Sequence, residues 1–562
     1  MPAASSFNRL LVASRAYFRE KFRFDLLSGV IVGLIALPLA IAFAVASGAR
    51  PEQGIYTSII AGLIVGLLSG SEFQVTGPTG AFVVILLNVI NAHGIDGLML
   101  AGFMAGVILV IMGLCRFGAI IRFIPYPVTV GFTSGIAVII FSGQIKDFLG
   151  LSFEHRPHDF IETIGMIGSH LAHGVNSGAV IVGAVTLAAH FLWQKYVKKF
   201  PPAPAALLAG VLTSLVLQAF FKGAVAAPAT IGAIPTGFPR VVLPSFSLEM
   251  MRNLLPSAFT IAALGAIESL LSAVVADGMT GKKHDSNKEL VAQGVGNMIL
   301  PFFNAIPATG AIARTAANIR NGAKTRMSTI VHSVVLLLIL LFAAPLARHI
   351  PLAALAAILM MVAYNMSEIP HFKHLLHSPK QDAAVLLMTF FLTVFTDLTT
   401  AVGIGVVLAA VLFIHRASQL TVYESLSEIE PSDSEEFKRL AASLQDYPQI
   451  VLYKVAGPLF FGVASEFENR IRHNSGEILI VRMKYVTQID ATGIHALEII
   501  IDRVLKNKGR IYLSTLHPRL VEKLTKAGLV AKIGGERYLA KSSAEAIEKA
   551  KADLTEHSDQ TA

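Results

Sequence analysis

The chain has 562 residues, of which 54% are hydrophobic and 15% are charged, and its mean hydropathy is +0.63. About a quarter of the residues in a soluble globular protein are charged, so this composition excludes an ordinary soluble domain and predicts a polytopic membrane protein. The net charge of +9 does not indicate nucleic acid, because the basic residues cluster beside apolar segments, and the single cysteine, Cys115, excludes an internal disulfide framework.

Fourteen apolar runs follow one another along the chain, and we interpret each as a membrane-crossing helix. Basic residues concentrate in the loops after every second run, which places both termini on the cytoplasmic side under the positive-inside rule. The third, ninth and tenth runs are short, and short interrupted segments at matching places in two halves point to a transporter site. The runs lie at residues 27–47, 55–70, 79–92, 97–115, 124–145, 177–194, 203–221, 256–277, 289–304, 310–319, 327–346, 350–366, 382–396 and 398–415.

The parts of the chain outside the apolar runs differ in composition. Residues 1–25 are basic and lack a small-residue cleavage site, so we expect a cytoplasmic segment and not a signal peptide. The transport domain then covers 26–416, and an acidic linker with Ser and Pro covers 417–448. From 449 to 552, strand-like and helix-like segments alternate, which predicts a soluble α/β domain. We expect 553–562 to be a frayed, flexible tail.

Two stretches of the apolar region share a short motif. Thr79-Gly80-Ala81 and Thr309-Gly310-Ala311 are separated by 230 positions, and the same separation relates Pro38 to Glu268. This shared separation, in a chain with about seven runs in each half, predicts two inverted repeats.

The sequence "TGPTGAF" at residues 76–82 places polar, helix-breaking residues at the start of an apolar run. Pro78 suits the first helical position, and Thr76 or Gly77 can cap the helix, so the next amides lack carbonyl partners. Residues 307–312 repeat this arrangement. Antiparallel repeats direct the two positive helix ends at each other, and free amides at helix N-termini bind anions. The stretch therefore predicts an anion site, with a plain loop as the alternative. The predicted amides belong to Thr79, Gly80, Ala81, Gly310, Ala311 and Ile312.

Two charged residues lie inside the apolar runs. Glu268 interrupts the eighth run, and a charge in hydrocarbon costs about 2.5 kcal/mol or more, so it should face a cavity. Burial disfavours the charged form of a carboxyl group, which suits a proton carrier, and Ser272 lies one turn away as a supporting residue. Arg314 can add positive charge to the site, and Phe43 can form a wall. The alternatives are a structural Glu268, an Arg314 that marks the inner mouth, and a Phe43 that serves packing alone.

The remaining motifs are weaker indications of function. His284 and Asp285 lack a third ligand, so we expect no metal site. No P-loop, nucleotide fingerprint or catalytic triad is evident, so we expect no cofactor, no ATP-driven pump and no enzyme. In the soluble domain, "IDATG" places Asp490 and Thr492 at a strand-to-helix turn, where a phosphate on Thr492 would be favoured. The alternative there is an ordinary helix cap.

Five longer stretches extend these motifs: "LPLAIAFAVASGARPEQGIYTSIIAGL", "TGPTGAFVVI", "GFTSGIAVIIFSGQIKDFLG", "LGAIESLLSAVVADGMTGKKHDSNKELVAQGVGN" and "PATGAIARTAANIR". Through them, residues 20–550 resemble the SulP family of anion transporters. The resemblance implies fourteen spans in two inverted seven-helix repeats, with core and gate domains. It also implies a C-terminal STAS domain, with Thr492 where the phosphoacceptor serine lies in similar domains, a homodimer, and STAS partners such as acyl carrier protein. The family's site, between spans 1, 3, 8 and 10, falls here on Phe43, Thr79, Gly80, Ala81, Glu268, Ala311, Ile312 and Arg314.

Within that family the chain is most similar to the bacterial branch for C4-dicarboxylates, because of Glu268 and "AIAR" at 311–314. The resemblance implies proton-coupled uptake of succinate, fumarate or aspartate across the bacterial inner membrane, with protons and membrane lipid as partners and no nucleic acid. The sodium-dependent bicarbonate branch is similar but tends to carry Asp, Thr and Thr where this chain has Glu268, Ser272 and Ile312. Sodium- or proton-coupled bicarbonate or sulfate transport is the alternative, and an anion channel and an anion sensor are alternatives of another class.

Overall fold

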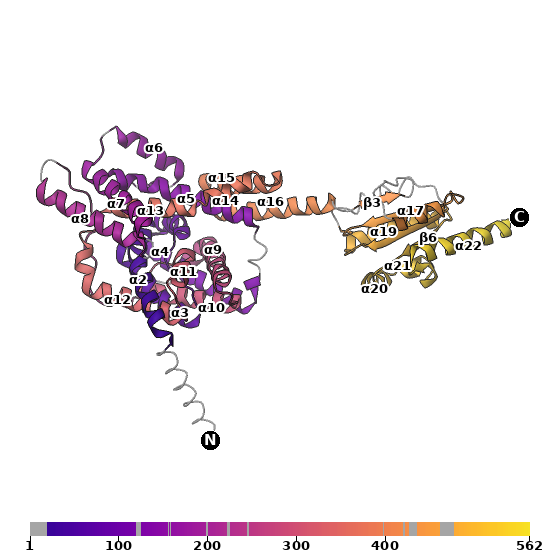
Figure 1. The fold of residues 1–562 in the computed structure, drawn as a ribbon, viewed down its shortest axis with the longest axis horizontal. Coiled ribbons are helices and arrows are strands. Elements are labelled where there is room, and N and C mark those ends of the chain that lie inside the picture. The colour runs from indigo at the N-terminus through magenta and orange to yellow at the C-terminus, as the bar shows by residue number, and fades with distance from the viewer. Residues whose placement is uncertain are drawn as a thin grey trace, which may run out of the picture. The chain divides into compact units, whose positions relative to one another are not determined.

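The computed structural model describes residues 20–119, 125–155, 157, 159–172, 174–197, 200–221, 225–243, 247–396, 398–419, 422–425, 435–460 and 477–561. The chain folds as two compact units. The described residues of the first unit, Met1–Ala409, are mostly helical, and those of the second unit, Ala410–Ala562, carry a five-stranded β-sheet (Figure 1).

All fourteen predicted runs coincide with helices, as a predominantly helical membrane domain requires. Nine helices among the described residues are long and apolar enough to cross a membrane by length and composition, so the count of fourteen spans stays a prediction. Two further helices, α6 (Phe160–Leu171) and α14 (Ile369–Leu376), lie between the predicted runs. The helices at the runs are α2 (Phe22–Ala46), α3 (Pro51–Leu68), α4 (Gly80–Leu114), α5 (Tyr126–Leu149), α7 (Ser177–Tyr196), α8 (Pro202–Phe220), α9 (Leu248–Thr280), α10 (Ser286–Ile299), α11 (Ile312–Arg320), α12 (Met327–Ala347), α13 (Leu352–Met366), α15 (Lys380–Phe395) and α16 (Leu398–Gln419).

Helix α4 contains two of the predicted runs. Its 35 residues continue across Gly94, whose φ of 70° and ψ of −172° are not helical. Glycine adopts this positive φ without strain because it has no Cβ. The third and fourth runs are therefore separated by a bend and not by a loop.

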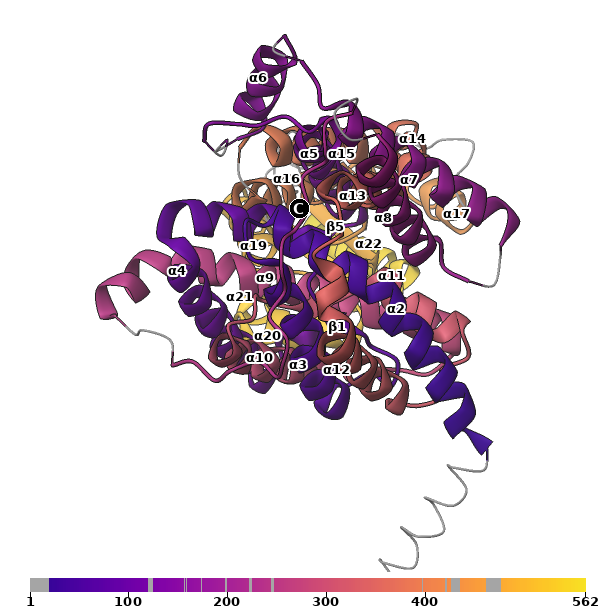
Figure 2. The ribbon, with the colours of Figure 1, turned by 90° about the vertical axis from the view of Figure 1, so that its left-hand side faces the viewer.

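The helices of the first unit pack in two groups. The core group consists of α2, α3, α4, α9, α10, α11 and α12, and the gate group consists of α5, α7, α8, α13 and α15. Figure 2 shows the core group in the lower part of the view and the gate group above it. Each group draws helices from both halves of the sequence, as inverted repeats require.

Two short strands connect the halves inside the core group. β1 (Thr76–Gly77) pairs antiparallel with β2 (Thr309–Gly310), with Thr76 opposite Gly310 and Gly77 opposite Thr309. The structural counterpart of Thr309-Gly310 is therefore Thr76-Gly77, and the match to Thr79-Gly80 at a separation of 230 is wrong by three residues. The stretch "TGPTG" contains Thr-Gly twice, and only the backbone pairing distinguishes the two copies.

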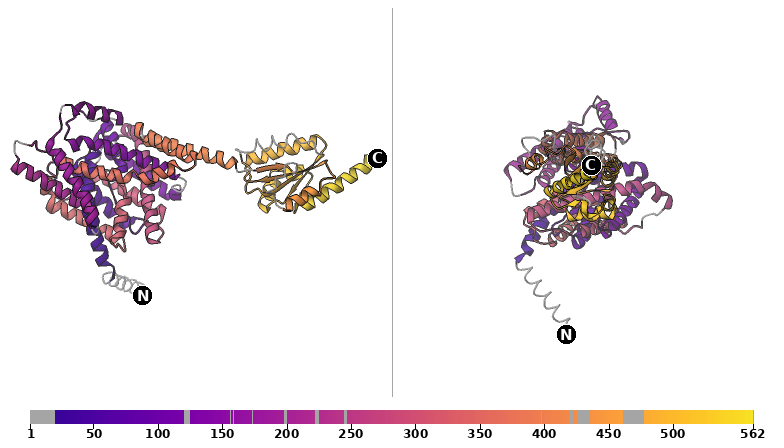
Figure 3. Two further views of the ribbon diagram at one scale, coloured as in Figure 1. Left: turned by 45° about the horizontal axis from the view of Figure 1, so that its top comes forward. Right: turned by 90° about the vertical axis from the view of Figure 1, so that its right-hand side faces the viewer.

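The second unit is the predicted α/β domain, built on a five-stranded sheet with the order β3-β4-β5-β6-β7. The first pair of strands is antiparallel and the others are parallel. The strands are β3 (Val422–Ser425), β4 (Ile450–Ala456), β5 (Ile478–Tyr485), β6 (Arg510–Ser514) and β7 (Leu539–Ala540). Helices cover both faces of the sheet (Figure 3): α19 (Ala491–Lys506), α20 (Pro518–Lys526) and α21 (Leu529–Lys532) on one, and α17 (Glu435–Ala442) and α22 (Ser543–Thr561) on the other.

The limits of this domain differ from the prediction. β3 and α17 lie inside the stretch expected to be an acidic linker, because β3 completes the edge of the sheet beside β4. Residues 426–434 of that stretch lie outside the described part of the chain. At the other end, α22 continues to Thr561, so the helix includes most of the residues expected to form a frayed, flexible tail from 553.

Asp553 fastens α22 to the sheet. Its carboxylate is 3% exposed and accepts hydrogen bonds from Tyr512 Oη at 2.6 Å and Arg537 Nη2 at 2.7 Å, and Arg510 Nη1 lies 2.8 Å away. Burial alone would raise the pKa of Asp553, but the bonds from Tyr512 and Arg510 outweigh burial and hold the pKa below its ordinary value of 3.8. Burial and the bond to Asp553 raise the pKa of Tyr512.

Candidate anion site

The first helix end of the site is the start of α4. Thr79 is the N-cap, with an extended backbone, and Gly80 is the first helical residue. Pro78 therefore precedes the helix by two positions, and the prediction that it opens the helix is wrong, because the pairing of β1 with β2 keeps the chain extended up to this point. The amides of Gly80 and Ala81 precede the first backbone hydrogen bonds of α4, so an open helix end lies at the predicted place.

The second helix end is the start of α11, with Ala311 as the N-cap. The Gly310 amide donates to Ser269 Oγ at 2.9 Å, and the Ala311 amide donates to the Val75 carbonyl at 2.9 Å. The prediction of free amides at Gly310 and Ala311 is therefore wrong, because the contacts of β2 with its neighbours use both. The open amides of this end begin at Ile312.

Side chains of the core group hold the two helix ends from behind. Ser272 Oγ donates to Thr315 Oγ1 at 3.0 Å, which links α9 to α11. Gln293 Nε2 donates to Thr76 Oγ1 at 2.9 Å, which links α10 to β1. Ser272 and Thr76 are both fully buried, so each acts through the helix ends that it positions.

Glu268 lies in the middle of α9 and faces the start of α4. Thr79 Oγ1 donates to Glu268 Oε2 at 2.8 Å, so the N-cap hydroxyl of α4 is directed at this carboxylate and makes no cap bond to its own helix. A hydroxyl can donate to a carboxylate or accept from a carboxylic acid. The pair can therefore persist in either protonation state of Glu268.

Arg314 is 2% exposed, and its guanidinium contacts backbone. Nη2 donates to the Pro78 carbonyl at 2.6 Å, which ties α11 to the residue ahead of the N-cap of α4. Nη1 has no hydrogen-bond partner among the described residues and lies beside Gly77, where a Cβ would approach it to 2.7 Å. Arg314 thus positions the two helix ends relative to each other while its positive charge stays in the wall of the site.

The two helix ends border one cavity of about 290 Å³. Gly310, Ser272 and Thr76 do not line it and lie behind its wall. The structure brings eight of the predicted residues to this cavity: Phe43, Thr79, Gly80, Ala81, Glu268, Ala311, Ile312 and Arg314.

The opposite wall was not predicted, and it comes from the gate group. Phe132 from α5 and Val362 and Met366 from α13 form its apolar part, and Glu368 adds a second carboxylate directly after α13. The signal that could have revealed Glu368 is an acidic residue at the end of the apolar run 350–366. The unpredicted lining residues are Leu39, Phe132, Thr133, Ile267, Leu271, Ala313, Val362, Asn365, Met366 and Glu368.

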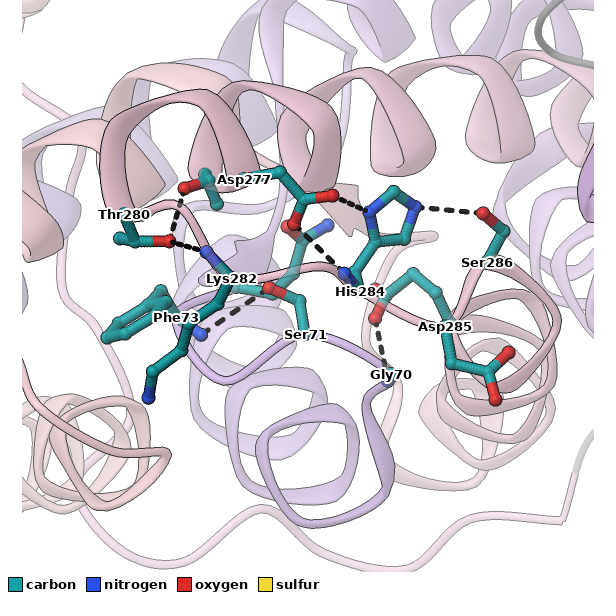
Figure 4. Close-up of polar contacts among 12 residues, drawn as sticks. Gly70, Ser71, Phe73, Asp277, Thr280, Lys282, His284, Asp285 and Ser286 are labelled. Atoms are coloured by element: carbon teal, nitrogen blue, oxygen red, sulfur yellow. Dashed lines mark hydrogen bonds and ion pairs between the residues drawn. The ribbon is translucent and has the colours of Figure 1, made fainter.

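A separate polar cluster joins the loop before β1 to the loop after α9 (Figure 4). Asp277 Oδ2 lies 2.8 Å from His284 Nδ1, and Ser286 Oγ lies 2.9 Å from His284 Nε2. This order resembles a hydrolase triad, but the two amides that follow Ser286 donate to Asp285 Oδ1, so the described residues offer no oxyanion hole there. The Asp285 amide donates to the Gly70 carbonyl at 3.1 Å, so the cluster fastens the loop that leads into β1.

These features define a multi-pass membrane protein in which two opposed helix ends border a cavity and a soluble α/β domain follows the last helix. The Sulfate permease family matches residues 22–389, and the STAS domain matches residues 441–546. The chain belongs to the sulfate permease family and carries a C-terminal STAS domain, which confirms the family predicted from the sequence.

Relatives of the chain are named as transporters, among them proteins from two bacteria. YvdB of Bacillus subtilis (strain 168), which carries the provisional name of a sulfate transporter, is 42% identical over 532 residues that cover 93% of this chain and 97% of YvdB. The bicarbonate transporter BicA of Picosynechococcus sp. (strain ATCC 27264 / PCC 7002 / PR-6) is 32% identical over 570 residues, 97% of each chain. Both names denote transport and neither denotes an enzyme. The C4-dicarboxylate branch stays a prediction.

Solved structures of anion transporters share the fold, and two of them show its extent. The transmembrane domain of a cyanobacterium bicarbonate transporter BicA has a TM-score of 0.60 and 30% identity, and the match covers 69% of this chain and 97% of that one. The overall structure of SLC26A9 has a TM-score of 0.81 over 99% of this chain and 96% of that one, at 18% identity. The second likeness concerns the fold alone.

Proposed function

We propose that the chain is a proton-coupled secondary transporter that holds a small anion between the starts of α4 and α11. The observation that carries the proposal is the hydrogen bond from Thr79 to Glu268, because it places a titratable carboxylate at the open helix end. Each helix end carries roughly half a positive charge, and Arg314 adds one full charge behind them. The cavity therefore offers fixed positive charge to an anion, and the carboxylate of Glu268 competes with the anion for it at the helix ends.

Coupling follows from the repulsion between this carboxylate and the anion. Two unit charges about 5 Å apart repel by about 3 kcal/mol at an effective dielectric constant of about 20. That energy lowers the affinity for the anion by more than about hundredfold while Glu268 is ionised. Protonation of Glu268 removes the repulsion, so anion and proton enter together, and loss of the proton on the other side expels the anion.

The lining of the cavity supports C4-dicarboxylates as the substrate class. Apolar side chains such as Leu39, Phe132 and Met366 surround the helix ends, and a cavity of about 290 Å³ is large for an inorganic oxyanion. A four-carbon chain can cover these apolar walls while its carboxylates meet the amides. The names of the relatives support the second candidate, bicarbonate or sulfate.

Transport in purified form tests the proposal. The full chain in liposomes is given an inward proton gradient and a panel of succinate, fumarate, aspartate, bicarbonate and sulfate. We expect uphill uptake of one class, which a channel cannot perform and a sensor does not show. Glu268→Gln should abolish uphill uptake and leave exchange of internal for external anion, whereas Glu72→Gln, which removes an exposed carboxylate outside the cavity, should behave as the wild type. Undiminished uphill uptake by Glu268→Gln would sink the proposal.

We also propose a bacterial inner membrane location with both termini in the cytoplasm, and a homodimer. The bacterial relative supports the location, and the charge of the loops supports the orientation. Thr492 is exposed in the first turn of α19, where Asp490 caps the helix by accepting from the Gly493 amide at 2.8 Å. Phosphorylation of Thr492 stays a prediction, and so does the binding of an acyl carrier protein by the STAS domain.

A further inference from the structure

Glu368 occupies a backbone position that favours glycine. It follows Ser367, the C-cap of α13, and has φ 43° and ψ 40°, which is the left-handed region. Helices commonly end with a left-handed residue at this position, and glycine usually fills it because other residues are strained there. The chain thus has a carboxylate where a residue without a side chain would be more stable. Such outliers cluster at ligand-binding and switch sites.

The side chain of Glu368 lies at the mouth of the cavity. It lines the cavity and is 43% exposed, so it is in contact with both the cavity and the outside. Ser134 Oγ donates to the Ser367 carbonyl at 2.7 Å, which fixes this corner of the chain to α5. The groups that face Glu368 from outside the cavity are His371, with Nδ1 at 3.5 Å from Oε2, and Tyr126, whose ring packs against that of His371. Those that share the cavity are Glu268 and Arg314.

The charges of the cavity balance only when protons are counted. Arg314 contributes one positive charge, and the ends of α4 and α11 contribute roughly half a charge each, so the positive total is about two. Ionised Glu268 and Glu368 cancel it. A dianion therefore adds two uncompensated negative charges, and two protons on the two carboxyl groups restore the balance.

We propose that Glu368 is a second proton-binding carboxylate of the cavity, so that the protein carries a dianion together with two protons. The inference rests on the proposed function, because it needs Glu268 as the first proton site. Glu368 belongs to the gate side of the cavity and Glu268 to the core side, so the bound dianion lies between the two carboxyl groups. Glu268 binds the proton that is coupled to the anion at the helix ends, and Glu368 binds the second proton.

Accumulation at equilibrium measures this number. The full chain is reconstituted in liposomes with the membrane potential held at zero and a pH difference of one unit, and accumulation of succinate and, in parallel, sulfate is followed to its plateau. Each coupled proton contributes a factor of about ten per pH unit. We expect about hundredfold accumulation by the wild type and about tenfold by Glu368→Gln. Glu368→Gly removes the carboxylate and also relieves the left-handed strain, so it should fold at least as well and also give about tenfold.

The outcomes separate the two proposals. Hundredfold accumulation by Glu368→Gln, or only tenfold by the wild type, overturns the second proton site while proton coupling stands. No accumulation by the wild type overturns the proposed function and the second site with it. If the variants are inactive in transport, the protons taken up when succinate binds to the purified protein in weak buffer are counted with a pH indicator. Two for the wild type and one for each variant support the inference, and equal numbers overturn it.

Discussion

Replacing Gly310 by alanine should separate the two helix ends of the site. A Cβ at residue 310 would lie 1.8 Å from Gln74 Nε2 and 3.1 Å from Ser269 Cα, so Gln74 or the backbone of β2 must move. Gln74 Nε2 donates to the Ser269 carbonyl at 2.9 Å, and leaving these buried groups unpaired costs about 1–3 kcal/mol. Overpacking of a filled interior adds about 1–3 kcal/mol. We therefore expect Gly310→Ala to lower the free energy of unfolding by about 2–6 kcal/mol.

Gly265→Ala is the matched control. A Cβ there would meet Phe82 Cζ at 3.4 Å, which is ordinary contact, and alanine is favoured over glycine within a helix such as α9 by about 1 kcal/mol. Thermal unfolding of the purified variants, with and without succinate or sulfate, measures both stability and binding. Gly310→Ala should melt earlier and lose the stabilisation by the anion, and Gly265→Ala should keep both. If Gly310→Ala melts and binds like the wild type, β2 does not hold the site as described.

Three further changes test other contacts. Thr79→Val removes the hydroxyl that donates to the Glu268 carboxylate, and such a hydrogen bond contributes about 1.5–3 kcal/mol. The ionised form of Glu268 is then disfavoured, so the pH of half-maximal uptake should rise by about one unit or more. An unchanged pH profile of uptake would contradict the pairing. Asp553→Asn should destabilise the STAS domain at neutral pH and matter less below about pH 4, because the lowered pKa of Asp553 gives stability that is lost as the pH falls through it; hydrogen exchange of the β6 amides measures both. Truncation near residue 428 should leave anion binding intact, since every lining residue of the cavity precedes α16, and loss of binding by a well-folded truncation would argue against this.

The parts of the site that the sequence predicts are those with a local chemical cause. Thr-Gly-Pro is a polar, helix-breaking stretch at the start of an apolar run, and Glu268 is an isolated charge within another apolar run. What the amides of Gly310 and Ala311 contact could not be predicted, because neither acceptor is a neighbour in the sequence. Ser269 Oγ lies 41 positions from Gly310, and the Val75 carbonyl lies more than two hundred positions from Ala311. The wall formed by the gate group could not be predicted for another reason. Lipid is as apolar as a helix interface, so the sequence of a span does not show which of its faces borders a cavity. The face of α5 that carries Phe132 is an example.

The pairing of β1 with β2 has a consequence for the direction of transport. Four residues of backbone join the two positive helix ends, so a motion of the gate group past the core group cannot pull these ends apart. An anion held between them keeps the same amides whichever side of the membrane the cavity opens to. We therefore expect nearly equal intrinsic affinities from the two sides. The protein would then act as a reversible carrier whose net flow is decided by the prevailing concentrations of anion and proton, and not by a built-in preference for import.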